Sequence, residues 1–325
     1  MRKKIYITGV AGMIGSNLAR SLVEEGNEVV GVDNLWRGAK KNIEDLLLKN
    51  NFQFRHADLI SDTDWAADIN SCDTIIHIAD IVAGIGYVFS NEWSIFAKNL
   101  AINSAVAKVV NSKEPALLIY LGTACSYPQR LQRSVADSGL VEGNKFPADP
   151  ESGYGWSKLV GEIEFNLVIK NGQTKFITLD LHNVYGWPCI YADKTAQVIP
   201  SLIYKAITSV DNKLSVWGNG KQGRAFLHTS DVVVAIKRAL VYEGSYSNFM
   251  IGPGSCTTIR EIAEIIKSHP SINIDEITYD ITKPTGDIGR FSASSLAKEE
   301  LGWAPLMDIS QGLNLLIDRV IDDWS

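Results

Sequence analysis

The chain has 325 residues, of which 46% are hydrophobic and 21% are charged, and its formal net charge is -6. This composition is typical of a globular protein with one large domain or two of moderate size. The acidic balance argues against a nucleic-acid surface, and no stretch reaches the roughly 18 apolar residues of a membrane span. The four cysteines lie far apart and form no C-x-x-C pair, which predicts neither a metal site nor a disulfide framework and fits a reducing cytoplasm.

The first half of the chain alternates short apolar runs with longer helical patterns. Strands are predicted at residues 4–10, 28–34, 52–59, 73–80, 116–122 and 175–186, and helices at residues 14–26, 39–50, 95–111 and 154–170. Such alternation predicts βαβ units and an α/β fold with a Rossmann-like, doubly wound parallel sheet. From Trp187 onward the segments are shorter and richer in Pro and Gly. We therefore expect a nucleotide-binding domain at residues 1–180, with a return segment near 225–250, and a smaller C-terminal α/β lobe, mainly substrate-binding, at residues 181–325.

The segment TGVAGMIG places Gly9, Gly12 and Gly15 between the first predicted strand and the first predicted helix. Glycines there allow a tight turn and let the backbone approach a pyrophosphate at the helix N-terminus. The second predicted strand reaches Asp33, about 20 residues on, where a carboxylate accepts ribose hydroxyls and repels a 2′-phosphate. This pattern predicts NAD rather than NADP, with Asp58 a candidate for the adenine end. A glycine loop that only packs the helix, and an Asp33 that only starts a turn, are the structural alternatives.

The segment YGWSK places Tyr154 and Lys158 four residues apart at the start of a predicted helix, so both side chains lie on one face. A phenol has a pKa near 10 and is a poor base at neutral pH, but a neighbouring ammonium lowers that pKa. Thr123 ends a buried strand earlier in the chain. This Thr123 and the dinucleotide motif before both residues give weight to a Tyr and Lys spacing that is common by chance.

Together these residues resemble the extended short-chain dehydrogenase/reductase family of nucleotide-sugar enzymes, over nearly the full length of the chain. The resemblance implies that Thr123 hydrogen-bonds a sugar hydroxyl, that Tyr154 removes its proton and that Lys158 binds the nicotinamide ribose, while the carbon gives its hydride to NAD. The cofactor contacts expected on this basis are Gly9, Gly12, Met13, Ile14, Gly15, Asp33, Asn34, Asp58, Leu59, Ala79, Asn99, Tyr154 and Lys158.

The same resemblance implies substrate contacts in the second half of the chain. Asn183 in HNVYG would contact a phosphate or the sugar, and Trp217 in VWGNG would lie near the nucleotide base, although a core aromatic is the equal alternative. Arg224 would bind the pyrophosphate, and Arg290 is similar to a second phosphate-binding arginine. Gln197 is also expected to contact the substrate.

Cys125 in LGTACSYP distinguishes the subfamilies. Sugar 4,6-dehydratases resemble TDEVYG at this place, and the acidic pair is missing here. A cysteine at this position with YP shortly after it resembles GDP-mannose 3,5-epimerases and GDP-L-fucose synthases. The resemblance implies that Cys125 acts as an acid/base beside a transient 4-keto group. Such a ketone acidifies the protons on C3 and C5, and a thiol with a pKa near 8.5 can exchange them near neutral pH. The alternative is that Cys125 only packs.

Inversion needs a second proton carrier on the opposite face of the sugar. In the 3,5-epimerases that this chain resembles, a lysine carries this second proton, and the nearest candidate here is Lys194, offset by about one residue. In fucose synthases the carrier is a histidine, at a position where this chain has Gln197, which cannot carry a proton. We therefore expect an NAD-dependent, homodimeric GDP-hexose 3,5-epimerase. A 4-epimerase or a 4-keto reductase or dehydrogenase on a similar sugar nucleotide, with a structural Cys125, and a non-catalytic NAD-responsive regulator are the alternatives.

Overall fold

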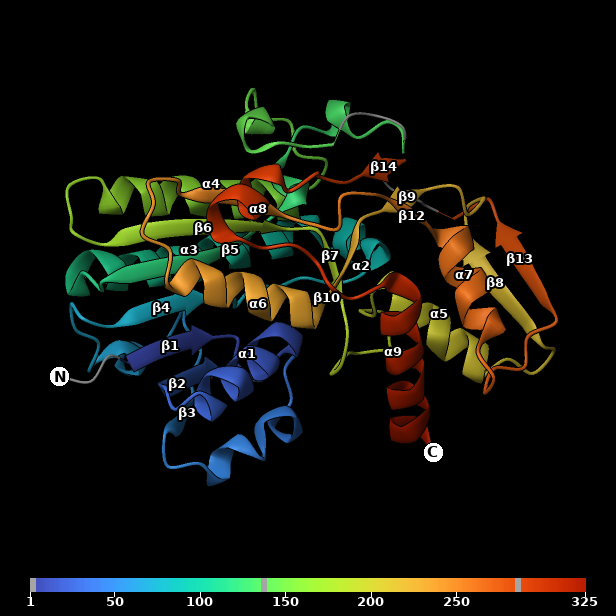
Figure 1. Ribbon diagram of the computed structural model, residues 1–325, viewed down its shortest axis with the longest axis horizontal. Coiled ribbons are helices and arrows are strands. Elements are labelled where there is room, and N and C mark those ends of the chain that lie inside the picture. Colours follow the sequence, from blue (N-terminus) through green and yellow to red (C-terminus); the bar gives the residue numbers. More distant parts are fainter. Residues whose placement is uncertain (1–3, 136–138, 284–287) are drawn as a thin grey trace.

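The computed structural model describes residues 4–135, 139–283 and 288–325. Within these residues, seven parallel strands form the central sheet in the order β11-β6-β5-β4-β1-β2-β3 (Figure 1). The strands are β1 (Lys4–Thr8), β2 (Glu28–Asp33), β3 (Phe52–His56), β4 (Thr74–His77), β5 (Leu117–Thr123), β6 (Lys175–Leu181) and β11 (Asn248–Ile251). This is the predicted Rossmann-like α/β architecture. β5 is buried at every position, as a central strand covered on both faces should be.

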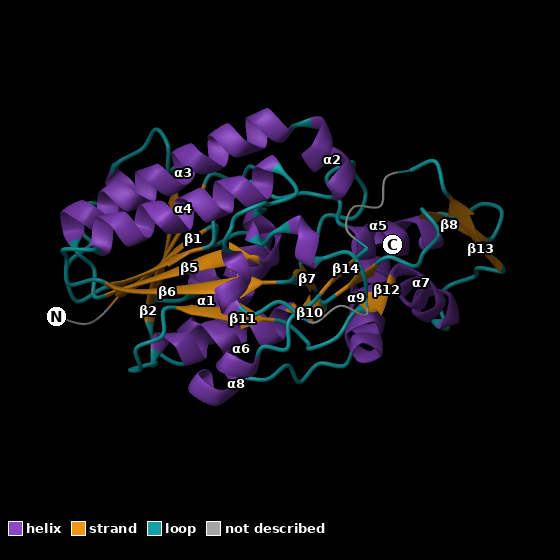
Figure 2. Cartoon of the chain, turned by 90° about the horizontal axis from the view of Figure 1, so that it is seen from above, coloured by secondary structure: helices purple, strands orange, loops and turns teal. Residues whose placement is uncertain are grey.

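Helices cover both faces of the sheet (Figure 2). One layer consists of α3 (Glu92–Lys113) and α4 (Gly153–Ile169), and the other of α1 (Met13–Glu24), α6 (Thr229–Leu240) and α8 (Ser295–Leu301). No helix among the described residues has both the length and the apolar character needed to cross a membrane.

The direction of winding changes between β1 and β4, which are neighbours in the sheet but are separated in sequence by β2 and β3. In open α/β sheets, a crevice forms outside the carboxyl ends of the strands at such a point. The loops that follow β1, β2, β4 and β5 meet there. This topology places the glycine motif beside the segments that carry Thr123 and Tyr154.

A second hydrophobic cluster lies beyond the carboxyl ends of the sheet, at the right of Figure 1. Its helices are α5 (Val198–Ile207), α7 (Ile259–Ser268) and α9 (Ile309–Trp324). The accompanying short strands are β7 (Asn183–Tyr185), β8 (Lys213–Trp217), β9 (Gly223–Arg224), β10 (Phe226–His228), β12 (Thr257–Thr258), β13 (Glu276–Asp280) and β14 (Gly289–Arg290). This cluster forms the far wall of the crevice.

The predicted helix at residues 39–50 is wrong. The segment forms two short 3₁₀ turns, Lys40–Ile43 and Leu46–Leu48. Arg20 donates hydrogen bonds to the Asn42 carbonyl and to the Asp45 carboxylate, so the Asn42 carbonyl already has a partner outside the segment. Tertiary contacts thus override a helical pattern in a short connection.

The predicted strand at residues 175–186 is two strands. β6 ends at Leu181, and His182 still bonds through its N–H to the Ile251 carbonyl of β11. The N–H of Asn183 bonds instead to the Ala225 carbonyl, and β7 pairs with β10. The chain therefore leaves the central sheet at His182 and turns Asn183 toward the crevice. A short helix, α2 (Ile85–Ser90), also precedes α3 and was not predicted.

Candidate active site

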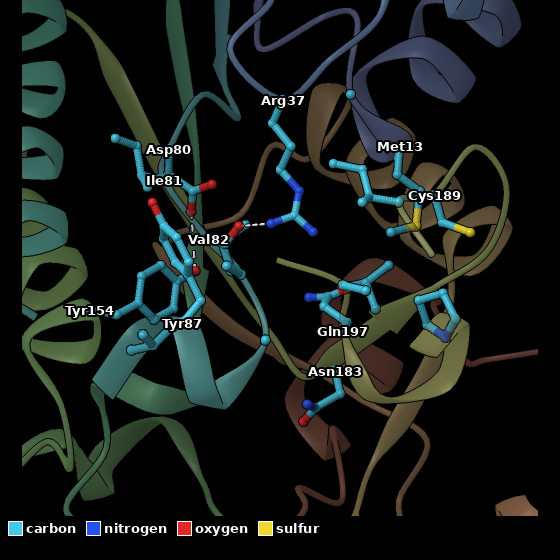
Figure 3. Close-up of a pocket in the computed structure, with 18 of the residues that line it drawn as sticks. Met13, Arg37, Asp80, Ile81, Val82, Tyr87, Tyr154, Asn183, Cys189 and Gln197 are labelled. Carbon is cyan, nitrogen blue, oxygen red and sulfur yellow. Dashed lines mark hydrogen bonds between the residues drawn. The ribbon is translucent and has the colours of Figure 1, made fainter. Parts of the chain in front are cut away.

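A cavity of about 1580 Å³ occupies the crevice between the sheet and the C-terminal elements. In Figure 3, Asp80 and Tyr154 lie on one wall, Met13 and Cys189 lie across from them, and Arg37 extends between the two. Most of the sequence-predicted residues line this cavity: Gly9, Gly12, Met13, Ile14, Gly15, Asp33, Asn34, Asp58, Leu59, Ala79, Thr123, Cys125, Tyr154, Asn183, Lys194, Gln197, Trp217, Arg224 and Arg290. Lys158 and Asn99 lie behind the wall, with 2% and 1% of their surface exposed.

The glycine motif forms a cradle that larger residues would fill. Gly9 has φ +74°, and a Cβ atom there would lie 2.9 Å from the Ala79 nitrogen. A Cβ on Gly15 would lie 2.2 Å from the Gly9 carbonyl oxygen. α1 begins directly after Gly12, so its first N–H groups and its dipole face the cavity. This arrangement fits the pyrophosphate of a dinucleotide.

The Asp33 carboxylate is held by two backbone N–H groups at the end of β2. Its oxygens accept hydrogen bonds from the Leu35 nitrogen at 2.7 Å and from the Ala11 nitrogen at 2.9 Å. Burial raises the pKa of Asp33, and these two bonds oppose that effect. Each oxygen keeps a lone pair for a ribose hydroxyl. Beside it, the Asn34 side chain donates to Asp58 at 3.0 Å.

We expect Asp33→Ala to lower the affinity for NAD about tenfold to a hundredfold, since it removes charged hydrogen-bond acceptors for the ribose. The wild-type protein should bind NAD far more tightly than NADP, and the variant should lose most of this preference. Isothermal titration calorimetry measures both affinities. Asp318→Ala, which removes an exposed carboxylate of α9 away from the cavity, is the control. Tighter binding of NADP by the wild type would contradict the assignment.

Tyr154 and Lys158 meet at a carboxylate that the sequence did not reveal. The Tyr154 hydroxyl donates to Asp80 Oδ2 at 3.1 Å, and Lys158 Nζ lies 3.3 Å from the same oxygen. The ammonium also lies 4.4 Å from the ring centroid of Tyr120. Burial lowers the pKa of Lys158, and Asp80 opposes this shift. Burial, followed by the Asp80 charge, raises the pKa of Tyr154 well above its usual value.

Cys125 faces the same cavity from the turn after β5. Thr123 Oγ1 accepts a hydrogen bond from the Cys125 nitrogen at 3.2 Å, which stabilises this turn. The thiol contacts a guanidinium, because Arg290 Nη1 donates to Cys125 Sγ at 2.7 Å. Arg290 Nη2 lies 3.4 Å from Glu151. A Cβ on Gly155 would lie 2.2 Å from the Cys125 carbonyl oxygen, so this glycine lets the first turn of α4 pack against the cysteine.

Positive charge gathers on the wall opposite the glycine cradle. Arg224 and Arg290 lie on the neighbouring strands β9 and β14, directly opposite each other in the parallel register. Burial, followed by the nearby Arg290 charge, lowers the pKa of Arg224 to about 10. Two guanidinium groups held this close favour an anion such as a pyrophosphate between them.

The remaining predicted substrate residues come from separate elements around the cavity. Trp217 ends β8 with 37% of its surface exposed, so it is not a core aromatic. Lys205 Nζ lies 5.4 Å from the Trp217 ring centroid. Asn183 and Gln197 are half-buried, whereas Lys194 is exposed on the loop before α5.

Sequence reasoning also missed Arg37, which lies four residues after Asp33. Its guanidinium donates to the Val82 carbonyl and, at 3.4 Å, to the Thr195 carbonyl. Burial lowers its pKa. The side chain therefore joins the loop after β4, where Figure 3 shows its bond to Val82, to the loop that carries Lys194. A cation in the segment DNLWRG was the available signal.

Comparison with known proteins gives the family. Residues 5–252 match the NAD dependent epimerase/dehydratase family. GDP-mannose 3,5-epimerase 1 of Oryza sativa subsp. indica is 30% identical over 310 residues, which cover 95% of this chain and 79% of that protein. GDP-L-fucose synthase 1 of Arabidopsis thaliana is 26% identical, covering 97% and 92%.

Solved structures have the same fold. UDP-glucose 4-epimerase of Thermotoga maritima superposes with a TM-score of 0.85 at 22% identity, covering 99% of this chain and 100% of that one. The chain belongs to the NAD-dependent epimerase/dehydratase family and is therefore an enzyme that uses NAD on a nucleotide sugar. The hypothesis of a non-catalytic regulator is set aside.

Proposed function

We propose that this enzyme is a GDP-hexose 3,5-epimerase that acts through a transient 4-keto sugar. The observation that carries the proposal is the Cys125 thiol on the cavity wall, in contact with Arg290 and within the turn that follows Thr123. A 4-epimerase needs no acid/base of this kind. The sequence similarity to GDP-mannose 3,5-epimerases supports the same substrate class.

The first step in the proposal is oxidation at C4. NAD held by the glycine cradle and Asp33 would supply the hydride acceptor for C4 and the hydride donor at the end of the cycle. Thr123 orients the 4-hydroxyl, and the Tyr154 phenolate accepts its proton. The Lys158 ammonium stabilises that phenolate and holds a ribose hydroxyl of the cofactor. Because the hydride returns to the same sugar, the cycle has no net redox change.

Inversion follows at the acidified carbons. In its thiolate form, Cys125 removes a proton from C5 or C3, and the electron pair moves into the C4 carbonyl. The ammonium of Lys194 delivers a proton to the opposite face as the enolate collapses. One proton leaves carbon and one returns, so the charge balances.

The nucleotide part of the substrate fits the positively charged wall. Arg224 and Arg290 suit the pyrophosphate, Asn183 suits a phosphate or sugar oxygen, and Gln197 offers a further polar contact. Trp217 presents an exposed ring on which a base can stack. The nearby Lys205 ammonium suits the O6 and N7 acceptors of guanine. These groups support a GDP-sugar.

Incubation with GDP-, UDP-, dTDP- and CDP-hexoses in deuterated water, followed by NMR of the sugar, tests the proposed function. We expect deuterium at C3 and C5 of a GDP-hexose and inversion at these carbons. Inversion confined to C4, without deuterium at its neighbours, would identify a 4-epimerase. Net formation of NADH would identify a dehydrogenase.

We also propose that the enzyme is a homodimer through α4. α4 exposes an apolar stripe with i, i+4, i+7 and i+11 spacing, formed by Trp156, Val160, Ile163 and Leu167, with 39%, 36%, 40% and 66% of their surfaces exposed. A helix that is apolar on both faces is usually covered on both. A second copy of the chain can cover the stripe by a two-fold axis, which is the common arrangement of homodimers.

We expect Ile163→Asp combined with Leu167→Asp to dissociate the dimer, because each carboxylate would be buried without a partner. Both positions are exposed in the single chain, so its fold should survive. Size-exclusion chromatography with light scattering measures the mass. Val241→Asp, at another exposed apolar position, should leave it unchanged. A monomeric wild type would contradict the proposal.

A further inference from the structure

Asp80 has no part in the steps above, yet it contacts two of their central residues. It lies three residues beyond the end of β4, and its side chain is 15% exposed on the cavity wall. A single oxygen, Oδ2, accepts the hydrogen bond of Tyr154 and pairs with Lys158. Figure 3 shows Asp80 directly beside the Tyr154 ring.

We propose that Asp80 is a positioning residue that holds Tyr154 in its protonated form and thereby sets the pH at which Tyr154 becomes a base. The proposal deepens the proposed function, because it rests on Tyr154 as the acceptor of the hydroxyl proton. It adds that the charges of Lys158 and Asp80 together set the pH at which the Tyr154 hydroxyl ionises.

The charges explain this control. A buried ammonium beside a phenol favours the phenolate, which is the state that the base needs. Asp80 opposes this in two ways, since its negative charge repels a phenolate and its oxygen binds the hydrogen of the neutral phenol. The Lys158 and Asp80 charges cancel, so Lys158 alone cannot draw the proton from Tyr154.

Other charged or titratable groups face this cluster from several elements. They are His77 on β4, Tyr120 on β5, Asp180 on β6, Cys125 in the turn after β5 and Arg37 in the loop after β2. All of them act at longer range than the direct contact of Asp80. Arg37 contributes a positive charge near both Tyr154 and Asp80. Asp80 differs from these groups because it contacts the phenolic oxygen itself.

The shared oxygen links ligand binding to activation. A hydroxyl group that donates to the Asp80 carboxylate competes with the Tyr154 hydroxyl for Oδ2. Each such ligand weakens the hold of Asp80 on the Tyr154 hydrogen. Tyr154 thus becomes a competent base when the cavity is filled.

Titration of Tyr154 tests the proposal without any sugar. The protein is labelled with tyrosine carrying ¹³C at Cζ, and the Tyr154 signal is identified by its loss in Tyr154→Phe. We expect ionisation in Asp80→Asn at least about one pH unit below that of the wild type. If the wild type stays protonated throughout the range in which it is folded, ionisation of the variant within that range is the expected result. An unchanged titration overturns the proposal.

Two further variants keep the test decisive. Asp80→Glu retains the carboxylate, so its Tyr154 titration should match that of the wild type. If Asp80→Asn fails to fold, Asp80→Glu takes its place in the test. A lowered Tyr154 pKa in Asp80→Glu then overturns the proposal. Asp323→Asn removes another carboxylate of the cavity wall, which contacts Tyr191 and Lys41 instead. It should leave the Tyr154 titration as in the wild type.

The kinetic consequence is a shift in the pH profile. With an accepted sugar nucleotide, the acid limb of the oxidation step should move to lower pH by about one unit in Asp80→Asn. A role confined to stability would change the amount of folded protein and leave this limb in place. If no sugar nucleotide is epimerised at C3 or C5, the proposed function fails, and the Tyr154 titration still decides the role of Asp80.

Discussion

Tyr154→Phe is expected to reduce oxidation of the sugar by about 10²–10⁴-fold while leaving NAD binding nearly intact. The substitution removes one oxygen and keeps the ring that packs in the cavity wall. Without that oxygen, the proposed acceptor of the 4-hydroxyl proton is lost. The absorbance of NADH at about 340 nm after addition of the sugar nucleotide measures the oxidation, and calorimetry measures NAD binding.

Two variants frame this result. Tyr87→Phe removes a phenol from the same cavity wall and should leave oxidation nearly unchanged. Lys158→Ala should damage both oxidation and NAD binding, because the ammonium is expected to serve both. Substantial turnover of Tyr154→Phe would mean that the base lies elsewhere in the cavity.

The sheet and the dinucleotide loop were predictable because their signals are local. Buried parallel strands appear as short apolar runs, and the glycine spacing reports a backbone that tolerates no Cβ at Gly15. The connection at residues 39–50 was not predictable in the same way. Its conformation depends on Arg20, which reaches it from another element.

The site itself was only partly predictable. Arg290 is 165 residues from Cys125, and Tyr154 is 74 residues from Asp80, so no local sequence pattern predicts either contact. Trp217 had a usable signal. Leu214 and Val216 are buried while the alternate positions of β8 are exposed, so the period of two places Trp217 on the open side of its strand.

Cys125→Ser is expected to retain reversible oxidation at C4 and to lose most deuterium uptake at C3 and C5. A hydroxyl is far less acidic than a thiol, so serine cannot form the anion that removes a carbon proton. The side chain is nearly the same size, and its oxygen can still accept from Arg290 in place of Sγ. The two readouts separate a defect at carbon from a loss of binding. Cys189→Ser, at another thiol of the cavity wall, should leave both readouts unchanged.

Lys194→Ala should give a different defect, because it removes the donor on one face and leaves the base on the other. Cys125 can then remove a proton and return a deuteron to the same face, so exchange should continue with retention of configuration while inversion stops. NMR distinguishes the outcomes, since deuterium uptake and the sugar configuration are measured on one sample. Loss of exchange and inversion together would instead place Lys194 on the same face as Cys125 or in substrate binding. Full inversion by Cys125→Ser would show that the thiol carries no proton and only packs at the end of β5.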